Sequence, residues 1–232
     1  MLYTKQQVQD NIRNRQGKRV FYLGQQDRLT PEARDYLSQQ RIEILSPEDI
    51  PKHAYRGENG GVFSEKPEHM THLNAEILVP KNHPRIRFRG SVDALEAELL
   101  LCQKAHPALE KALQELLDLA RLLIRCDVLE QPLGEVTLCG LSQQEQRRRS
   151  HFPQDYYGIP HFMPSREDSE TILQLNRLRA MTRQTEIAAL DAFSDRWGNP
   201  TRPDILRALN RMSSMLYLLM IEEKANKGNK VM

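Results

Sequence analysis

The sequence has few cysteines, few aromatic residues and no long apolar run. Its 232 residues include three cysteines, at positions 102, 126 and 139, and none belongs to a Cys-x-x-Cys pair. This pattern indicates neither a disulfide framework nor a zinc knuckle, so we expect reduced thiols in a cytoplasmic protein. The longest apolar run, 215–221, is far shorter than the roughly 20 residues that span a bilayer. The N-terminus has no apolar signal core, and we expect no membrane partner.

The sequence also lacks the charge excess and the motifs of common nucleotide and nucleic-acid binders. A formal net charge of +2 is too small for whole-surface attraction to nucleic acid, which only the basic run 147–149 suggests. There is no Walker-type phosphate loop, no strand-anchored Gly-x-Gly-x-x-Gly and no Gly-x-Ser-x-Gly elbow. We therefore expect no nucleic-acid partner, and any anion site must be local.

The first 64 residues are predicted to form a small α/β appendage followed by a linker. Thr30 and Pro31 are typical of a helix N-cap and first turn, and they lie between two β-prone stretches, 18–23 and 41–45. The stretch 46–65, with its prolines and clustered glycines, is typical of a linker or mobile loop.

Residues 65–232 are predicted to form a mainly α domain. Residues 85–89 alternate like a strand, but a helix is favoured there because helical spacing follows at once. Ser142, the box 165–168 and Thr201 are predicted helix starts. The expected buried stripes are Val92, Leu95, Leu99 and Cys102; Leu109, Leu113, Leu116, Leu117, Ala120, Leu123 and Ile124; Ile172, Leu175, Leu178, Ile187 and Leu190; and Ile205, Leu209, Met212, Leu216 and Leu219.

Two polar helix faces lie near the end of this domain. Arg179, Arg183 and Glu186 stand at i, i+4 and i+7, so two guanidiniums and a carboxylate share one face. Asn210 interrupts the apolar pattern of the next helix. Together they indicate an anionic ligand held between helices. The alternatives are a solvated ladder of charges for the first helix and a satisfied amide linking helices for Asn210.

These residues belong to motifs that identify a family. Leu-Asn-Arg-Met-Ser-Ser at 209–214, preceded by Arg-x-x-x-Arg-x-x-Glu at 179–186, resembles the C-terminal signature of PduO-type ATP:corrinoid adenosyltransferases. The ethanolamine-utilisation branch is more similar still. The further matches are RLTPEAR at 28–34, KPxxxTHL at 66–73, HPRxxFRGxxDAL at 83–95 and RPDILxALNRxSS at 202–214.

The resemblance implies a bundle of about five helices that transfers the 5′-deoxyadenosyl group of ATP to the cobalt of cobalamin. It implies ATP with Mg²⁺, a homotrimer with sites between subunits, and partners among ethanolamine-utilisation or microcompartment proteins. The expected location is cytoplasmic, with association with a bacterial microcompartment. The rival hypothesis is a non-catalytic helical sensor or scaffold that binds a corrinoid or a nucleotide.

The resemblance also implies roles for individual residues. Arg183 would contact the triphosphate, Glu186 would orient that arginine or the ribose, and Asn210 would meet the mixed polar edges of the nucleotide. Arg179 would pair with Asp93 on the first bundle helix and join subunits. The alternative for Asp93 is an acid near a helix start, which the macrodipole alone favours.

The phosphate loop departs from the general family pattern Thr-x-x-Gly-Asp-x-Gly. Thr71 is followed by neither the glycine nor the aspartate, as in the ethanolamine branch. Phosphate binding would therefore fall to side chains, with Thr71 and Lys81 as candidates. Arg85, Arg87 and Arg89 extend this basic stretch, and a solvated basic turn is the alternative.

Two further expectations concern metals. Some members of the branch carry a His and a CCxxC cluster before the KP segment, but here the stretch 46–65 holds His53 and no cysteine. We expect no tightly bound transition metal there. In the family an aromatic wedge excludes the lower axial ligand of cobalt, which tunes its reduction. The candidates for that wedge are Phe152, Tyr156, Tyr157 and Phe162.

Overall fold

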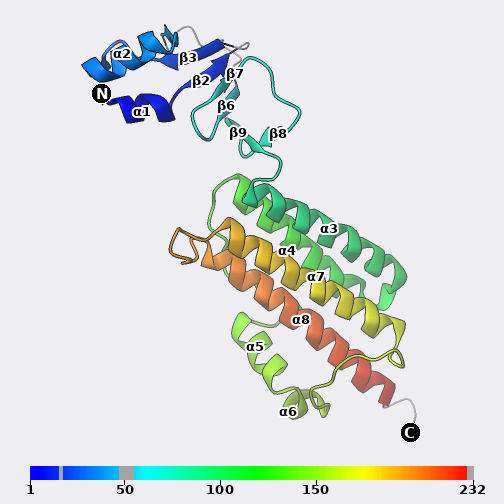
Figure 1. Cartoon of the computed structure of the whole chain (residues 1–232). Coiled ribbons are helices and arrows are strands. Elements are labelled where there is room, and N and C mark those ends of the chain that lie inside the picture. Colours follow the sequence, from blue (N-terminus) through cyan, green and yellow to red (C-terminus); the bar gives the residue numbers. More distant parts are fainter. Residues whose placement is uncertain (16–17, 47–54, 229–232) are drawn as a thin grey trace. The chain divides into compact units, whose positions relative to one another are not determined.

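The computed structural model describes residues 1–15, 18–46 and 55–228, in two compact units, Met1–His83 and Pro84–Met232. We call them the N-terminal unit and the bundle unit and describe each by itself (Figure 1). Residues 65–83, which the sequence analysis assigned to the helical domain, pack with the N-terminal unit. The domain boundary after residue 64 stays a prediction.

The N-terminal unit opens with the predicted small α/β fold. Thr30 caps α2, because its side chain accepts the backbone N–H of Ala33, and this confirms the predicted helix start. Strands β3 and β5 flank α2 and pair in parallel, with Phe21 and Leu37 buried between helix and sheet. The elements are β1 (Leu2–Tyr3), α1 (Lys5–Asp10), β2 (Arg13–Arg15), β3 (Lys18–Tyr22), β4 (Arg28–Leu29), α2 (Pro31–Gln39) and β5 (Glu43–Leu45).

A second sheet follows, where a linker was predicted. The prediction is wrong for residues 55–63, because a tight turn lets this stretch pair as a hairpin: Gly57 N–H donates to Gly61 O at 2.6 Å, and Gly60 has φ 79°. Residues 47–54, including His53, lie outside the described residues. The strands are β6 (Tyr55–Gly57), β7 (Val62–Phe63), β8 (Met70–His72) and β9 (Ile77–Pro80), in the order β7-β6-β9-β8.

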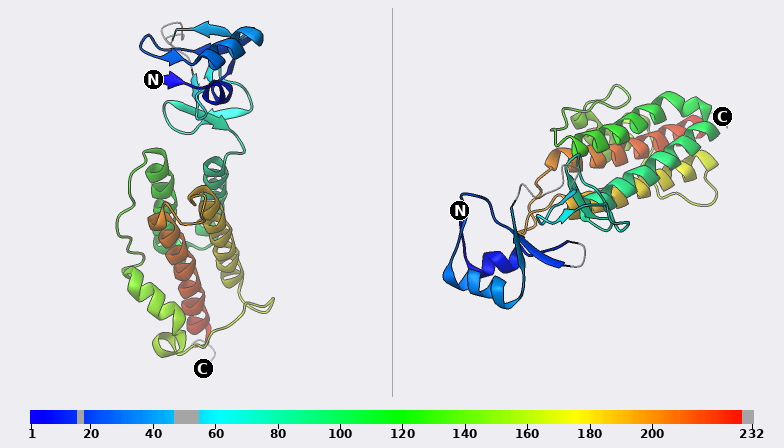
Figure 2. Two further views of the ribbon diagram at one scale, coloured as in Figure 1. Left: turned by 60° about the vertical axis from the view of Figure 1, so that its left-hand side comes forward. Right: turned by 90° about the horizontal axis from the view of Figure 1, so that it is seen from above.

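The bundle unit confirms the predicted mainly α fold. Its four long helices are packed in the sequence α4, α3, α7, α8, and the shorter α5 lies against α8 (Figures 1 and 2). Within the described residues, no helix has the length and apolar character needed to cross a bilayer. The helices are α3 (Pro84–Ala105), α4 (Glu110–Val128), α5 (Gln143–His151), α6 (Pro153–Tyr157), α7 (Glu170–Ala192) and α8 (Pro203–Gly228), with a 3-10 turn at Pro107–Leu109.

The helix starts were predicted with mixed success. Ser142 forms a full capping box with Glu145, as expected, and residues 85–89 are helical. The box 165–168 instead closes a separate turn, and Ser169 caps α7. Thr201 does not cap α8 either, because its hydroxyl donates to Phe193 O at 2.9 Å and holds the α7–α8 loop.

The stripe of α8 is buried as predicted, but that of α7 is only partly so. Ile187 and Leu190 are 63% and 43% exposed. Thr182 and Thr185 take the inner positions instead, because each satisfies its hydroxyl on a carbonyl of its own helix, at 2.8 and 3.0 Å. The outer face of α7 therefore carries unburied apolar side chains.

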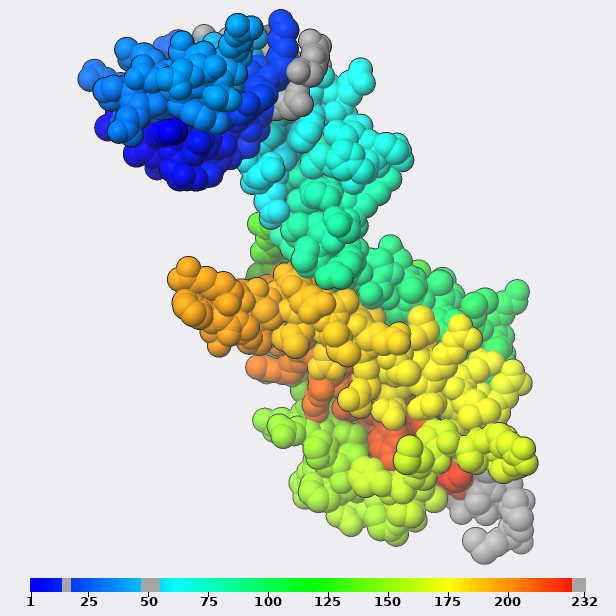
Figure 3. All heavy atoms as spheres, in the orientation of Figure 1, coloured from blue at the N-terminus to red at the C-terminus, as the bar shows by residue number. Residues whose placement is uncertain are grey.

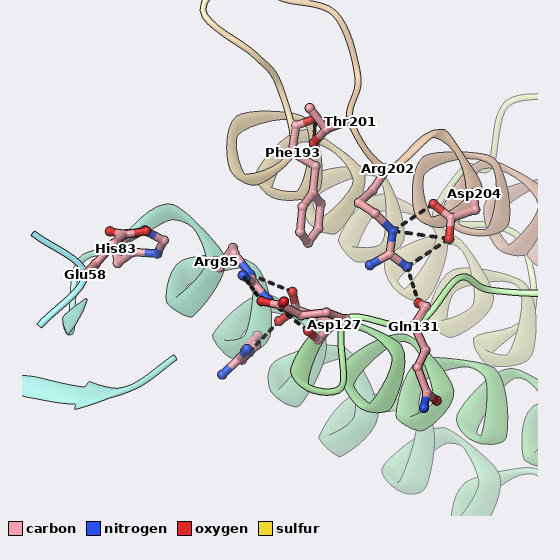
Figure 4. A network of polar contacts seen from close by, with 11 residues as sticks. Glu58, His83, Arg85, Asp127, Gln131, Phe193, Thr201, Arg202 and Asp204 are labelled. Carbon is pink, nitrogen blue, oxygen red and sulfur yellow. Dashed lines mark hydrogen bonds and ion pairs between the residues drawn. The ribbon is translucent and has the colours of Figure 1, made fainter. Parts of the chain in front are cut away.

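A buried carboxylate ties α3 to α4. Asp127 is fully buried and accepts Arg85 Nε at 2.8 Å on one oxygen and Arg89 Nε at 2.6 Å on the other. Arg85 also donates to the backbone carbonyl of Asp127 at 2.8 Å (Figure 4). Two arginines of the predicted basic turn are therefore not solvated; they fix the start of α3 on the end of α4.

The start of α8 is held by a second carboxylate. Asp204 accepts Arg202 Nη2 and the backbone N–H of Leu133, both at 2.8 Å, and Arg202 also donates to Gln131 O (Figure 4). Burial opposes ionisation of Asp204, but these hydrogen bonds and the charge of Arg202 lower its pKa to about 2. The carboxylate therefore stays ionised and anchors α8 beside the loop that follows α4.

Replacing the buried carboxylate should destabilise the protein strongly. We expect Asp127→Asn to lower the free energy of unfolding by about 3–5 kcal/mol, because two mostly buried guanidiniums lose the buried carboxylate that they share, and only Arg85 keeps a second one, the exposed Glu130. Asp191→Asn is the control, since Asp191 lies 3.8 Å from Arg87 with both side chains more than half exposed, and should cost less than about 1 kcal/mol. Urea unfolding compares them, and equal losses would contradict the structural role of Asp127.

Candidate active site on the seam of helices α7 and α8

We call the line along which α7 and α8 pack the seam. One polar contact crosses it toward the end that lies near the α7–α8 connection. Asn210 on α8 donates its amide to Glu186 on α7 at 3.2 Å, and its carbonyl oxygen accepts Arg211. The three side chains form a short chain in which the carboxylate orients the amide. The structure thus brings together two residues that the sequence analysis had placed in one site, and the partner of Glu186 is Asn210. Arg211 was missed, since nothing in its spacing distinguishes it from a surface charge.

A second contact lies further along the same seam. The guanidinium of Arg179 on α7 sits 5.7 Å from the ring centroid of Tyr217 on α8, a cation–π distance. Its Nε is buried and has no hydrogen-bond partner among the described residues. Arg179 is therefore held by an aromatic face and keeps a donor for a further group.

The two contacts define the register of an antiparallel helix pair. Both Arg179 to Glu186 and Asn210 to Tyr217 span seven residues, or roughly 10 Å along a helix. Arg183 lies between the contacts on α7, and the register sets it level with Ser213. Its side chain is exposed and has no ion-pair partner among residues 1–15, 18–46 and 55–228.

An aromatic pocket opens at the Tyr217 end of the seam. It has a volume of about 300 Å³ and is lined by His161, Phe162, Met163, Arg179 and Tyr217. Phe162 and His161 both stack on Tyr217, with centroids 6.2 and 5.8 Å away. His161 Nδ1 also lies 3.0 Å from the Tyr217 hydroxyl. The pocket walls are therefore fixed by mutual contacts, and a candidate from the sequence, Arg179, belongs to them.

The four aromatic residues predicted as candidates for the wedge below cobalt differ in their position relative to this pocket. Phe162 lines it, whereas Phe152 and Tyr156 are 57% and 41% exposed. Tyr157 packs against the bundle core, where burial raises the pKa of its phenol. The sequence analysis missed Tyr217, which stacks on Phe162. It lies about two helical turns beyond Asn210 on α8.

Three further candidates from the sequence are not part of the seam. Two of them belong to the N-terminal unit, and the third lies on α3 of the bundle unit. Thr71 lies in β8 of the N-terminal unit, opposite Val79. Lys81 Nζ lies 3.2 Å from Glu68, and both side chains are largely exposed. Asp93 is exposed on α3 and makes no ion pair with Arg179 or any other described residue of the chain.

The cysteines of the bundle unit have the properties of structural thiols. Burial raises the pKa of both Cys102 and Cys139 to about 11, with a further contribution from nearby carboxylates. Cys126 is also buried. Among the described residues, no three His, Cys, Asp or Glu side chains are grouped so that they could hold a metal ion.

Comparison with known proteins places this geometry in context. The family model described as cobalamin adenosyltransferase matches residues 62–223. Corrinoid adenosyltransferase EutT of Escherichia coli (strain K12) is 40% identical over 99 residues, which are 43% of this chain and 37% of that protein. Corrinoid adenosyltransferase EutT of Salmonella typhimurium is 38% identical over 99 residues, which are again 43% of this chain and 37% of that protein. The match thus covers little more than a third of these relatives, at 37%. No solved structure matches.

Proposed function

This chain belongs to the cobalamin adenosyltransferase family, and we propose that it is an ATP:cob(I)alamin adenosyltransferase of ethanolamine utilisation. The observation that carries the proposal is the α7–α8 seam, which has a polar end at Asn210 and an aromatic pocket at Tyr217, roughly 10 Å apart. The two substrates of the proposed reaction need different environments. The polyphosphate of ATP needs a polar one, and the corrin ring needs an apolar one. A non-catalytic sensor or scaffold is not favoured, because the matching relatives are enzymes by name.

The reaction forms one bond and breaks another. Cobalt(I) supplies the electron pair for the new bond to C5′ of ATP. The C5′–O bond breaks, and its electron pair leaves with triphosphate. The protein therefore has to hold C5′ in line with cobalt and to stabilise the negative charge that develops on the leaving group.

The polar end of the seam suits the leaving group. Arg183 is exposed and has no counter-charge among the residues that the structure describes, so it is available to a phosphate oxygen. Glu186 holds the amide of Asn210 in one orientation and limits the rotamers that the ligand must select. Thr71 and Lys81 of the N-terminal unit remain proposed ligands of ATP. Mg²⁺ would arrive as part of the ATP complex.

The aromatic pocket suits the corrin. A corrin ring has wide apolar faces, and Phe162 and Tyr217 offer stacked rings to such a face. We assign to Phe162 the exclusion of the lower axial ligand, because it alone among the four sequence candidates lines the pocket. Loss of that ligand makes the cobalt easier to reduce.

The outer face of α7 supports assembly around the site. Arg183, Ile187 and Leu190 share this face, and both apolar side chains are exposed. Asp93 has no partner within the described chain, which fits a pair with Arg179 across subunits. We propose that the protein is a cytoplasmic homotrimer. We also propose that it associates with ethanolamine-utilisation or microcompartment proteins.

The function is tested by incubating the protein with ATP, Mg²⁺ and chemically reduced cobalamin. Formation of adenosylcobalamin is followed by its cobalt absorption spectrum. Arg183→Ala should lower kcat/KM for ATP by about ten- to a hundredfold, because one charge-assisted contact to the triphosphate is lost. Arg177→Ala on the same helix is the control, since Arg177 pairs with Glu98 and is 66% exposed. Full activity of the Arg183 variant would remove this arginine from the site.

The role of Phe162 predicts an effect that depends on the cobalt oxidation state. Phe162→Ala should lose most activity when cob(II)alamin and a reductant are supplied, and should recover much of it with cob(I)alamin made beforehand. The reason is that the wedge assists reduction and not the attack on C5′. Phe152→Ala, at a 57% exposed phenylalanine, should behave as wild type in both assays. An equal loss for Phe162→Ala in both assays would assign it to general corrin binding instead.

The intersubunit pair predicts a change in assembly. Asp93→Ala should shift the trimer toward monomer at low protein concentration and lower the activity in parallel, because Arg179 loses its counter-charge at the interface. Asp118→Ala, at an exposed position on α4, is the control. Light scattering after size exclusion measures the mass, and a trimer unchanged by Asp93→Ala would contradict the pair.

A further inference from the structure

A cleft lined by three arginines adjoins the polar end of the seam. It has a volume of about 550 Å³, within the range of small-molecule sites, and lies between α5 and α8. Figure 3 shows α8, in red and orange, recessed between the yellow α7 and the yellow-green α5. The lining residues on which the argument depends are Glu135, Ser142, Arg147, Arg207 and Arg211. We call this site the arginine cleft.

The charge in the arginine cleft is not balanced by the protein. Arg147, Arg207 and Arg211 form no ion pair with a carboxylate in the part of the chain that the structure describes. Glu135 is the one acid in the lining, against three guanidiniums. Burial lowers the pKa of Arg211, and the charges of Arg147 and Arg207 lower it further while Glu186 opposes them. Like charges therefore crowd one another here.

Arg211 also has an unused donor. Its Nη1 is buried and has no hydrogen-bond partner among the described residues, while its Nη2 donates to Asn210. A buried guanidinium donor without an acceptor is costly unless a ligand supplies one. Arg211 therefore belongs both to the lining of the arginine cleft and to the polar contact at Asn210.

We propose that the arginine cleft binds a polyphosphate chain, with Arg147 and Arg207 as phosphate ligands beyond the sites at Arg183 and Asn210. This inference rests on the proposed function for the identity of the polyphosphate as the triphosphate of ATP and its product. The cleft places the phosphate tail at the end of the seam away from the aromatic pocket, so the adenosyl end points toward the corrin.

The charge favours a polyphosphate over the other phosphate that the reaction supplies. The nucleotide loop of cobalamin carries a single phosphodiester with one negative charge, whereas triphosphate carries several. Three unpaired guanidiniums match the larger charge, since each acts as a donor fork for a different phosphate group. Ser142 is already engaged as the N-cap of α5, so the arginines supply the specificity of this site.

The experiment measures binding of inorganic tripolyphosphate to the full chain by calorimetry at fixed ionic strength. Arg147→Gln and Arg207→Gln should each weaken binding at least about tenfold, and the double variant at least about a hundredfold. Both side chains are exposed and neither forms an ion pair among the described residues, so the variants should keep the wild-type unfolding midpoint. Arg148→Gln is the matched control, because Arg148 follows Arg147 on α5 but faces Tyr156, and should weaken binding less than about fivefold.

Other results would overturn the inference. Absence of tripolyphosphate binding by the wild type, or equal effects of Arg147→Gln and Arg148→Gln, would contradict a built site. If the variants bound hydroxocobalamin more weakly relative to cobinamide, which lacks the nucleotide loop, and still bound tripolyphosphate as the wild type does, the cleft would be a site for the phosphodiester and the inference would be wrong. Adenosylation by the wild type is measured separately. Activity without tripolyphosphate binding would refute the cleft alone, and arginine-dependent binding without activity would refute the proposed function alone.

Discussion

The antiparallel register of α7 and α8 is the constraint on which the site depends. It is set by the short connection between the helices, where Thr201 donates both its N–H and its hydroxyl to Phe193 O, at 2.6 and 2.9 Å. Inside that loop, Asp195 accepts the N–H groups of Trp197 and Asn199. With the loop closed in this way, a slip of one residue would face Glu186 with a neighbour of Asn210. The loop thus fixes which side chains meet on the seam, although it holds none of them.

The arginines of the bundle unit separate into two groups by their counter-charges. Arg85 and Arg89 share the buried Asp127, and Arg202 is paired with Asp204, so these guanidiniums serve to join helices. Arg183 and Arg207 have no carboxylate partner among the described residues, and both are exposed near the seam. A cation that the fold leaves unpaired near a cleft is available to an anionic ligand. Composition hides this division, because the net charge is only +2.

Much of the fold could be predicted where local chemistry decides the structure. The capping box at Ser142 and the Thr30 cap depend on groups three residues further along the chain, at Glu145 and Ala33, and both form. Thr201 was misjudged because its hydroxyl is used by a carbonyl eight residues earlier, which no local rule includes. Ile187 was wrongly assigned to the core from the spacing of apolar residues alone. Threonines line the helix interface instead, because each donates its hydroxyl to a carbonyl of its own helix.

The candidate site was predictable in part for the same reason. Glu186 and Asn210 stand in recognisable motifs, and the structure brings them into contact. Tyr217 and Arg211 could not be found by spacing alone, because their importance comes from neighbours on other elements: Phe162 before α7 and the cleft residues of α5. Residues at the boundary between helices therefore need the three-dimensional register before a role can be assigned to them.

In the proposed reaction, the asymmetry of the seam would also set the orientation of the nucleotide. Positive charge gathers at the Asn210 end, where Arg211 and the arginine cleft meet, while stacked rings occupy the Tyr217 end. A nucleotide bound in the reverse sense would leave the three guanidiniums of the arginine cleft unpaired. Its phosphates would meet an end where Arg179 and Lys224 already lie over aromatic rings. Electrostatics therefore favours the orientation in which C5′ approaches the corrin and the leaving group departs toward the cations. Under the proposed function, one pair of helices would position both substrates, because its two ends differ in polarity.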